Sequence, residues 1–166
     1  MTAINEHLKT AINDVLNDAD LLDRLGILAE QMKPESPFRD AVFIALRRRN
    51  IDCSIEAEAD SGGKRTDLVL LHEPGRAEAV EFKFWLAPDT RTPAKIIRDA
   101  LADRAKHGGQ TTIVTLFSDV RSVKYFRNAS EHAWNLQVSR ATVADAIGAS
   151  EHWQATAQHW VVDVCR

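Results

Sequence analysis

Apolar residues near the start of the chain recur every three or four positions, which is the spacing of one face of a helix. The repeat covers residues 3–31 and is interrupted near Asn17–Asp20, so it predicts two helical segments. A further helix is expected after the segment KPESP, with Pro37 in its first turn and an end at about Arg49.

The middle of the chain changes to the short, alternating apolar runs that are typical of strands. Three such strands are predicted in IDCSIEAEA (51–59), TDLVLLH (66–72) and AEAVEFKFW (77–85), with a turn at EPGR between the last two. Thr92–Pro93 should open a helix that ends at Gly108–Gly109, and QTTIVTLFS (110–118) is typical of a buried strand. The predicted order is therefore helix, three strands, helix, strand.

The remaining 47 residues, 120–166, are predicted to form a helix over 121–133, another near 141–156, and a last strand in HWVVDVC. One alternative is a DNA-binding helix-turn-helix in TVADAIGASEHWQA (142–155). Its second helix should bury an apolar residue near the position of Gln154, so we interpret this likeness as chance.

Length and composition indicate one soluble domain of 166 residues with an ordinary apolar core. We expect a cytoplasmic location, because no apolar run is long enough to cross a bilayer, the first residues are not a secretory signal, and Cys53 and Cys165 have no CxxC spacing. The net charge is −3, with −4 on residues 1–40 and +1 on residues 41–166. A nucleic acid would therefore meet local patches of the second part.

Charged residues interrupt the apolar pattern of the 66–85 hairpin in an unusual way. Side chains alternate along a strand, so Glu81 and Lys83 share one face while Val80 and Phe82 share the other. If three or five residues form the loop around Pro74, Asp67 lies directly opposite Glu81, with the two side chains about 5 Å apart. Two carboxylates that close require a proton or a cation between them, and Lys83 and a divalent cation are the two candidates. A metal beside a lysine suits phosphodiester cleavage.

These residues resemble the PD-(D/E)xK nuclease superfamily, which has the restriction-endonuclease-like fold. The resemblance rests on Asp67 and on Glu81-x-Lys83 on adjacent strands, between two helices, and it covers roughly residues 33–119. It implies an α/β fold with an αβββαβ core, a mixed sheet flanked by helices, and Mg²⁺ or Mn²⁺ as cofactor. It also implies that Asp67, Glu81 and the Phe82 carbonyl bind the metal and that Lys83 positions or activates the attacking water.

The resemblance also implies an acid on the preceding helix and a polar side chain on the following one. Helical spacing puts Glu35 on the core-facing side and Asp40 near the opposite side, so Glu35 is preferred as a further metal ligand and catalytic residue. The following helix lacks the usual Gln, and Lys95 or Arg98 could substitute for it. Lys64, Arg65, Lys95 and Arg98 are the expected contacts to nucleic acid.

The sequence thus predicts a single domain with a helical extension at 1–32, a nuclease-like core at 33–119 and a C-terminal extension at 120–166. Its expected function is metal-dependent hydrolysis of DNA or RNA. The alternative is a catalytically inactive protein of the same fold that binds nucleic acid or protein. We expect no membrane partner, and the leucine-rich N-terminal helices could pair in a homodimer. Trp85 shares the Glu81 face and could stack on a base, although packing in the core is the better interpretation.

Overall fold

The structure is a computed structural model that describes residues 4–30, 34–58, 65–73, 76–86, 92–107, 111–118, 144–158 and 160–166. The predicted helix at 121–133 lies outside these residues. Three helices come first, α1 (Glu6–Leu16), α2 (Ala19–Glu30) and α3 (Glu35–Arg48). They are followed by β1 (Cys53–Glu58), β2 (Arg65–Glu73), β3 (Arg76–Leu86), α4 (Thr92–Lys106) and β4 (Thr111–Ser118), and the chain ends with β5 (His152–Ala157) and β6 (Trp160–Cys165).

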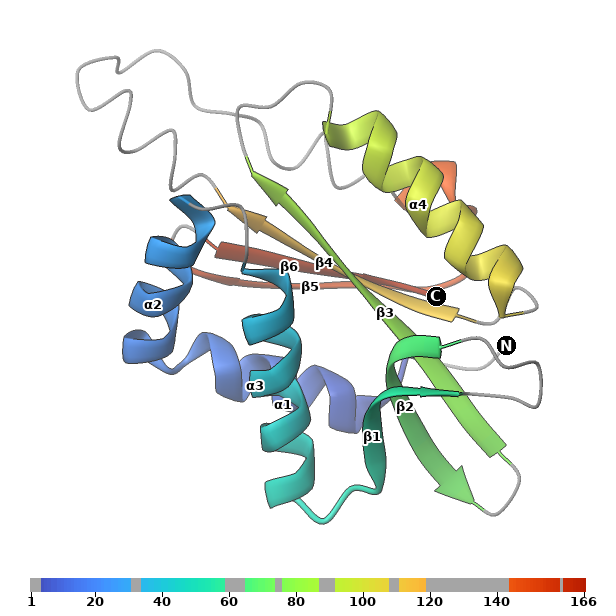
Figure 1. Cartoon of the computed structure of the whole chain (residues 1–166), viewed down its shortest axis with the longest axis horizontal. Helices are drawn as coiled ribbons and strands as arrows, with labels where there is room; N and C mark the ends of the chain where they lie inside the picture. Colours follow the sequence, from blue (N-terminus) through green and yellow to red (C-terminus); the bar gives the residue numbers. More distant parts are fainter. Residues whose placement is uncertain are drawn as a thin grey trace.

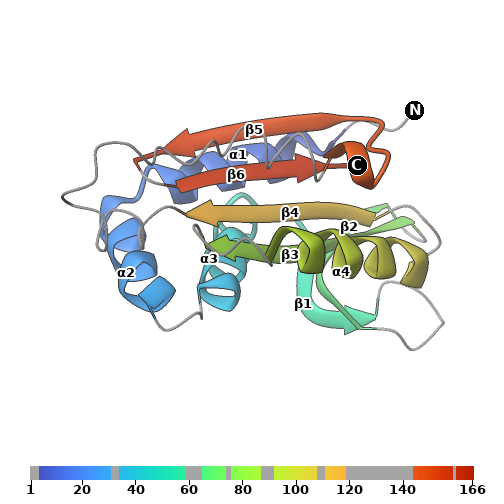
Figure 2. The same ribbon diagram turned by 90° about the horizontal axis from the view of Figure 1, so that it is seen from above.

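The strands form one six-stranded mixed sheet in the order β1-β2-β3-β4-β6-β5. The β3 and β4 strands are parallel, and α4 connects them, whereas the other neighbours are antiparallel. Helices α1 and α3 lie on one side of the sheet and α4 lies on the other (Figures 1 and 2). The expected α/β class with a mixed sheet between helices is therefore confirmed.

Alternation along the strands separates two apolar layers. Val80 and Phe82 of β3 pack with α1 and α3 in the larger core, where the Phe38 and Phe82 rings meet edge to face at 6.1 Å. On the α4 side, Trp85 packs with Ile96 and Phe117. Trp85 is 1% exposed, and its ring centroid lies 5.1 Å from that of Phe117. Trp85 is a core residue, which agrees with its preferred interpretation.

The apolar faces of α1 and α2 are buried within the chain. Their buried residues include Leu8, Ile12, Leu16, Leu22 and Leu25, which contribute to the core. Pairing of these leucine-rich helices in a homodimer stays a prediction. Among the residues described, none of the helices is both long enough and apolar enough to span a membrane.

The hairpin of β2 and β3 reaches the predicted register by an unexpected route. Glu73 pairs with Arg76, so only two residues separate the last paired positions. A simple hairpin with this loop would put Asp67 opposite Phe82. However, the register shifts between Leu71 and Glu73, where β2 contains one extra residue, and Leu68 pairs with Val80. One step further along this register, Asp67 lies opposite Glu81.

The helix predicted near 141–156 is wrong at 152–156, and its first residues, 141–143, lie outside the described residues. Residues 144–146 form only one helical turn, which is followed by Gly148 at φ +63°, and His152–Ala157 is a strand rather than a helix. Its side chains alternate between exposed and half-buried because it is an edge strand that pairs with β6 alone. The same strand rules out the helix-turn-helix in 142–155, since the second helix does not exist.

Candidate active site

Asp67 and Glu81 come together near one end of the β2–β3 pair. The backbone N–H of Phe82 donates to Asp67 Oδ2 at 2.8 Å, which holds this carboxylate against β3. Burial raises the pKa of Asp67, and the charge and a side-chain hydrogen bond of Glu81 raise it further, against the lowering effect of the Phe82 N–H. The two carboxyl groups are therefore close enough to share a proton.

Lys106 and His107, at the end of α4, both contact Glu81. Lys106 Nζ and His107 Nε2 each lie 3.1 Å from Glu81 Oε1, and the Glu81 side chain is only 5% exposed. Burial alone would raise the pKa of Glu81, but the hydrogen bonds from His107 and Lys106 outweigh it and lower the pKa. The folded chain therefore stabilises the ionised form of Glu81 and disfavours the ionised form of Asp67.

Lys83 lies beside this pair and is largely buried. Its Nζ forms an ion pair with Asp103 Oδ2 of α4 at 2.7 Å and donates to the Phe82 carbonyl at 3.0 Å. Burial alone would lower the pKa of Lys83, but Asp103, Glu81 and Asp67 together raise it. The ammonium group therefore stays charged, which favours a role in positioning and charge stabilisation over proton abstraction.

Glu35 is the first residue of α3 and lies near enough to the same cluster to be affected by its charges. Pro34 precedes it without a side-chain cap, so Ser36 does not exclude Glu35 from the helix. Burial raises the pKa of Glu35, and among charged neighbours Lys83 and Asp67 affect it most. Asp40 instead pairs with Arg39 at 2.8 Å and is 47% exposed. Of the two acids considered on this helix, Glu35 is the one in the cluster.

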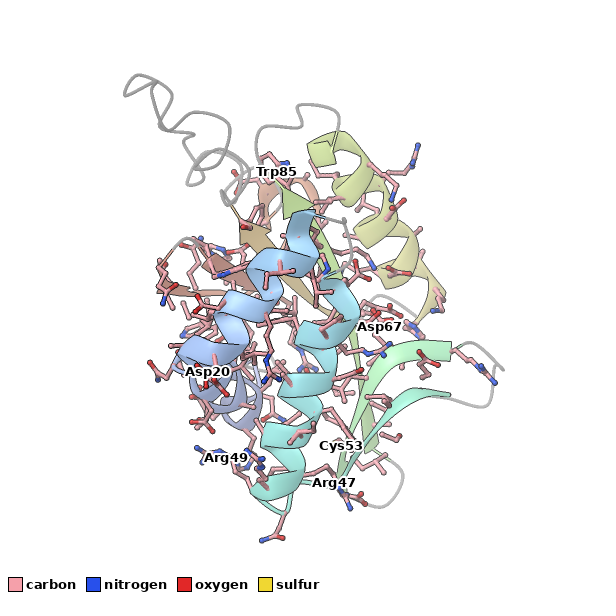
Figure 3. The ribbon with its side chains drawn as sticks, turned by 60° about the vertical axis from the view of Figure 1, so that its left-hand side comes forward. Asp20, Arg47, Arg49, Cys53, Asp67 and Trp85 are labelled. Atoms are coloured by element: carbon pink, nitrogen blue, oxygen red, sulfur yellow. The ribbon has the colours of Figure 1, made fainter. Side chains whose placement is uncertain are left out.

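Arg39 connects α3 to the outer edge of the cluster. Its Nη1 lies 3.2 Å from Glu56 Oε1 of β1 and 4.0 Å from Asp67 Oδ1. In Figure 3, Asp67 lies among acidic and basic side chains between α3 and α4.

Of the four residues expected to contact nucleic acid, the three that the structure describes are not gathered at the cluster as the acids are. Lys64 lies outside the described residues, and Arg65 is exposed at the start of β2. The side chains of Lys95 and Arg98 are 68% and 75% exposed, and both contact Asp99. Lys95, one of the two proposed substitutes for the missing Gln, still lowers the pKa of Glu35 by its charge.

Three residues of the cluster were not foreseen, namely Asp103, Lys106 and His107. The signal for two of them was present, since Ile96, Ala100, Asp103 and His107 follow one helical stripe that changes from buried apolar to polar side chains. His107 is 3% exposed, and its Nδ1 has no hydrogen-bond partner among the residues that the structure describes. A buried, partly unsatisfied histidine beside a carboxylate pair is typical of a site that binds something.

The donor groups of this cluster fit a hard divalent cation. The predicted ligands Glu35, Asp67 and Glu81, with the Phe82 carbonyl, all offer oxygen, which is the donor that Mg²⁺ and Mn²⁺ prefer. Four carboxylates face two ammonium groups here, because Asp103 adds a fourth acid and Lys83 and Lys106 are the bases. The roles of the individual ligands remain predictions.

Comparison with protein-family models, with curated proteins and with solved structures finds no match for this chain.

Proposed function

We propose that this protein is a metal-dependent nuclease that hydrolyses phosphodiester bonds at the Asp67–Glu81–Lys83 cluster. The observation that carries the proposal is that Asp67 and Glu81 lie together beside the buried Lys83, with Glu35 near enough for the charges of Lys83 and Asp67 to affect its pKa. The order α3-β1-β2-β3-α4-β4 supports it, because it is the order expected of the restriction-endonuclease-like core.

Mg²⁺ or Mn²⁺, when bound by Asp67, Glu81, Glu35 and the Phe82 carbonyl, would polarise the phosphate and acidify a water. Lys83 would stabilise the negative charge that develops on the phosphate oxygens, because its ammonium group is held charged and largely dry. Asp103 would orient that ammonium group through its 2.7 Å ion pair.

Glu35 is the group best suited to move a proton. Burial raises the pKa of its carboxyl group, which makes the ionised side chain a stronger base than an exposed glutamate. We therefore assign to Glu35 the acceptance of a proton from the attacking water, and to Lys83 the positioning of the phosphate.

The alternative, an inactive binding protein with the same fold, is favoured by one specific observation. Glu81 is already held by Lys106 and His107, and Lys83 is already paired with Asp103. If these ion pairs are the purpose of the cluster, it needs no metal and performs no chemistry. Metal binding distinguishes the two functions.

The test is incubation of the protein with plasmid DNA, single-stranded DNA and structured RNA in Mg²⁺ or Mn²⁺, with EDTA as the negative control. We expect cleavage of at least one substrate, and we expect Lys83→Ala to abolish it while calorimetry shows that Mn²⁺ still binds. Lys9→Ala is the matched control, because Lys9 is also a paired lysine, with Glu6 at 2.8 Å, but lies on α1. Full cleavage by Lys83→Ala would contradict the assigned role. A wild type that neither cleaves nor binds Mn²⁺ would favour the binding protein.

A further inference from the structure

A second cluster of potential ligands lies on β5 and β6, among residues with no part in the proposed cleavage. His152, Asp163 and Cys165 offer one nitrogen, one oxygen and one sulfur, and these ligand atoms all lie within 4.8 Å of one another. His152 Nε2 contacts Asp163 Oδ1, and Cys165 Sγ lies 3.3 Å from Asp163 Oδ2. Gln154 Nε2 also donates to Asp163 Oδ1 at 3.0 Å.

Asp163 is the centre of this cluster, and its burial requires an explanation. Its side chain is 0% exposed, whereas His152 is 35% exposed and opens the cluster to solvent at the edge of the sheet. A buried carboxylate is costly unless it is paired or binds a metal. The contact with His152 and the hydrogen bonds from Gln154 and Cys165 are the simpler explanation, but they do not account for a buried hydroxyl on the neighbouring strand.

Thr115 of β4 pairs with Asp163 in the sheet, so both side chains point to the same face. Thr115 is fully buried, and its Oγ1 has no hydrogen-bond partner among the described residues. A buried hydroxyl without a partner usually indicates a group or water that would complete its surroundings. The Thr115 hydroxyl is not one of the three potential ligands, and it lies on the same face of the sheet as Asp163.

We propose that His152, Asp163 and Cys165 form a binding site for a zinc-type divalent ion. Imidazole, thiolate and carboxylate together are the donor set of Zn²⁺, whereas Mg²⁺ prefers oxygen alone. On binding, Cys165 loses its S–H proton to solvent and binds as thiolate, while His152 binds through neutral Nε2. Three protein ligands leave the fourth position of a tetrahedral site to water, and the Thr115 hydroxyl lies on the same face of the sheet as Asp163.

This site is distinct from the proposed active site but lies on the same face of the sheet. Lys83 pairs with Thr115 across β3 and β4, and Thr115 pairs with Asp163 across β4 and β6. Two strand spacings separate β3 from β6, so Lys83 and Asp163 are about 10 Å apart at this row. One ion therefore cannot serve both clusters, and the hard and the soft donor sets should bind different metals.

The test is titration of the metal-free full chain with Zn²⁺ and with Co²⁺, which reports a thiolate ligand by a charge-transfer band. We expect one tightly bound Zn²⁺ per chain, a cobalt–thiolate band, and no competition from Mg²⁺. His152→Ala and Cys165→Ser should each lower the Zn²⁺ affinity by more than about tenfold. Mutation of residues that only hydrogen-bond to metal ligands already causes a loss of about this size.

Cys53→Ser is the matched control, because Cys53 is the other buried cysteine and lies on β1, at the opposite edge of the sheet. It should retain Zn²⁺ and the cobalt band. His152 lies on the exposed edge strand, so its replacement keeps the proposal testable even if Cys165→Ser fails to fold. Failure of the wild type to bind Zn²⁺, or full affinity in His152→Ala, would overturn the proposal. Neither outcome depends on nuclease activity.

Discussion

The two acids of the candidate active site should respond oppositely to removal of their charge. Glu81→Gln and Asp67→Asn make the same isosteric change in side chains that face each other. Glu81 loses two charge-assisted hydrogen bonds, from Lys106 and His107, each 3.1 Å long. Such a bond contributes about 1.5–3 kcal/mol and a neutral one about 1 kcal/mol, so Glu81→Gln should cost about 2 kcal/mol. In a chain of this size that is a fall of about 4–8 °C in Tm.

Asp67→Asn removes a charge that the folded chain disfavours, because burial and Glu81 raise the pKa of Asp67. The metal-free variant should be as stable as the wild type or more stable. A bound metal should reverse this order, since Mn²⁺ at a hundredfold excess over its Kd stabilises the wild type by about 2.7 kcal/mol. Both variants should lose most of that gain.

Chemical denaturation at neutral pH, with EDTA and with Mn²⁺, measures these differences. The pH dependence checks their cause. The pKa of Glu81 is lowered on folding, so its stabilisation is complete above the unfolded pKa of about 4.3 and is lost as the pH falls through the folded value. The cost of Glu81→Gln should disappear in that acidic range. Equal destabilisation of both variants, or none in either, would refute the assignment of Glu81 as the acid that Lys106 and His107 stabilise.

Two further predictions concern other positions. Burial raises the pKa of Glu35, so its ionisation costs stability as the pH rises from the unfolded pKa of about 4.3 through the folded value. Glu35→Gln should therefore be more stable than the wild type at neutral pH and equal to it in acid, and a constant difference across pH would contradict the burial of this charge. Gln158, between β5 and β6, has φ +51°, so Gln158→Gly should stabilise the protein by about 1 kcal/mol in urea melts. A loss of stability there would show that the Gln side chain contributes more than its backbone strain costs.

Sequence patterns predicted the strands with strong apolar runs and missed the one without them. The strands β2, β3, β4 and β6 each have a buried face with several apolar residues, so period and length identify them. In β5 the exposed positions are His152, Gln154 and Thr156, and the strand is defined by its pairing with β6, which no local pattern reveals. Tertiary pairing overrode the helical appearance of that segment.

The same contrast applies to the candidate site. Asp67, Glu81 and Lys83 were identifiable because strand alternation determines the face of each residue, and a charge on an otherwise apolar strand is conspicuous. Asp103 and His107 continue the apolar stripe of α4, but polar residues near the end of a helix ordinarily face solvent, so the stripe alone did not assign them to the site. Lys106 lacks even this signal, and its role follows from how α4 packs against β3.

Because β2 contains one extra residue, Asp67 faces Glu81 only when the number of residues between them is odd. Thirteen residues separate Asp67 from Glu81, an odd number, whereas a two-residue turn alone would require an even one. Loss of a single residue from the hairpin would turn Asp67 toward the core face, where its charge has no compensation. Loss or gain of two residues would leave its orientation unchanged. Insertions and deletions in this hairpin are therefore constrained by whether their length is odd or even, and the chemistry of the site depends on the count of residues as much as on their identity.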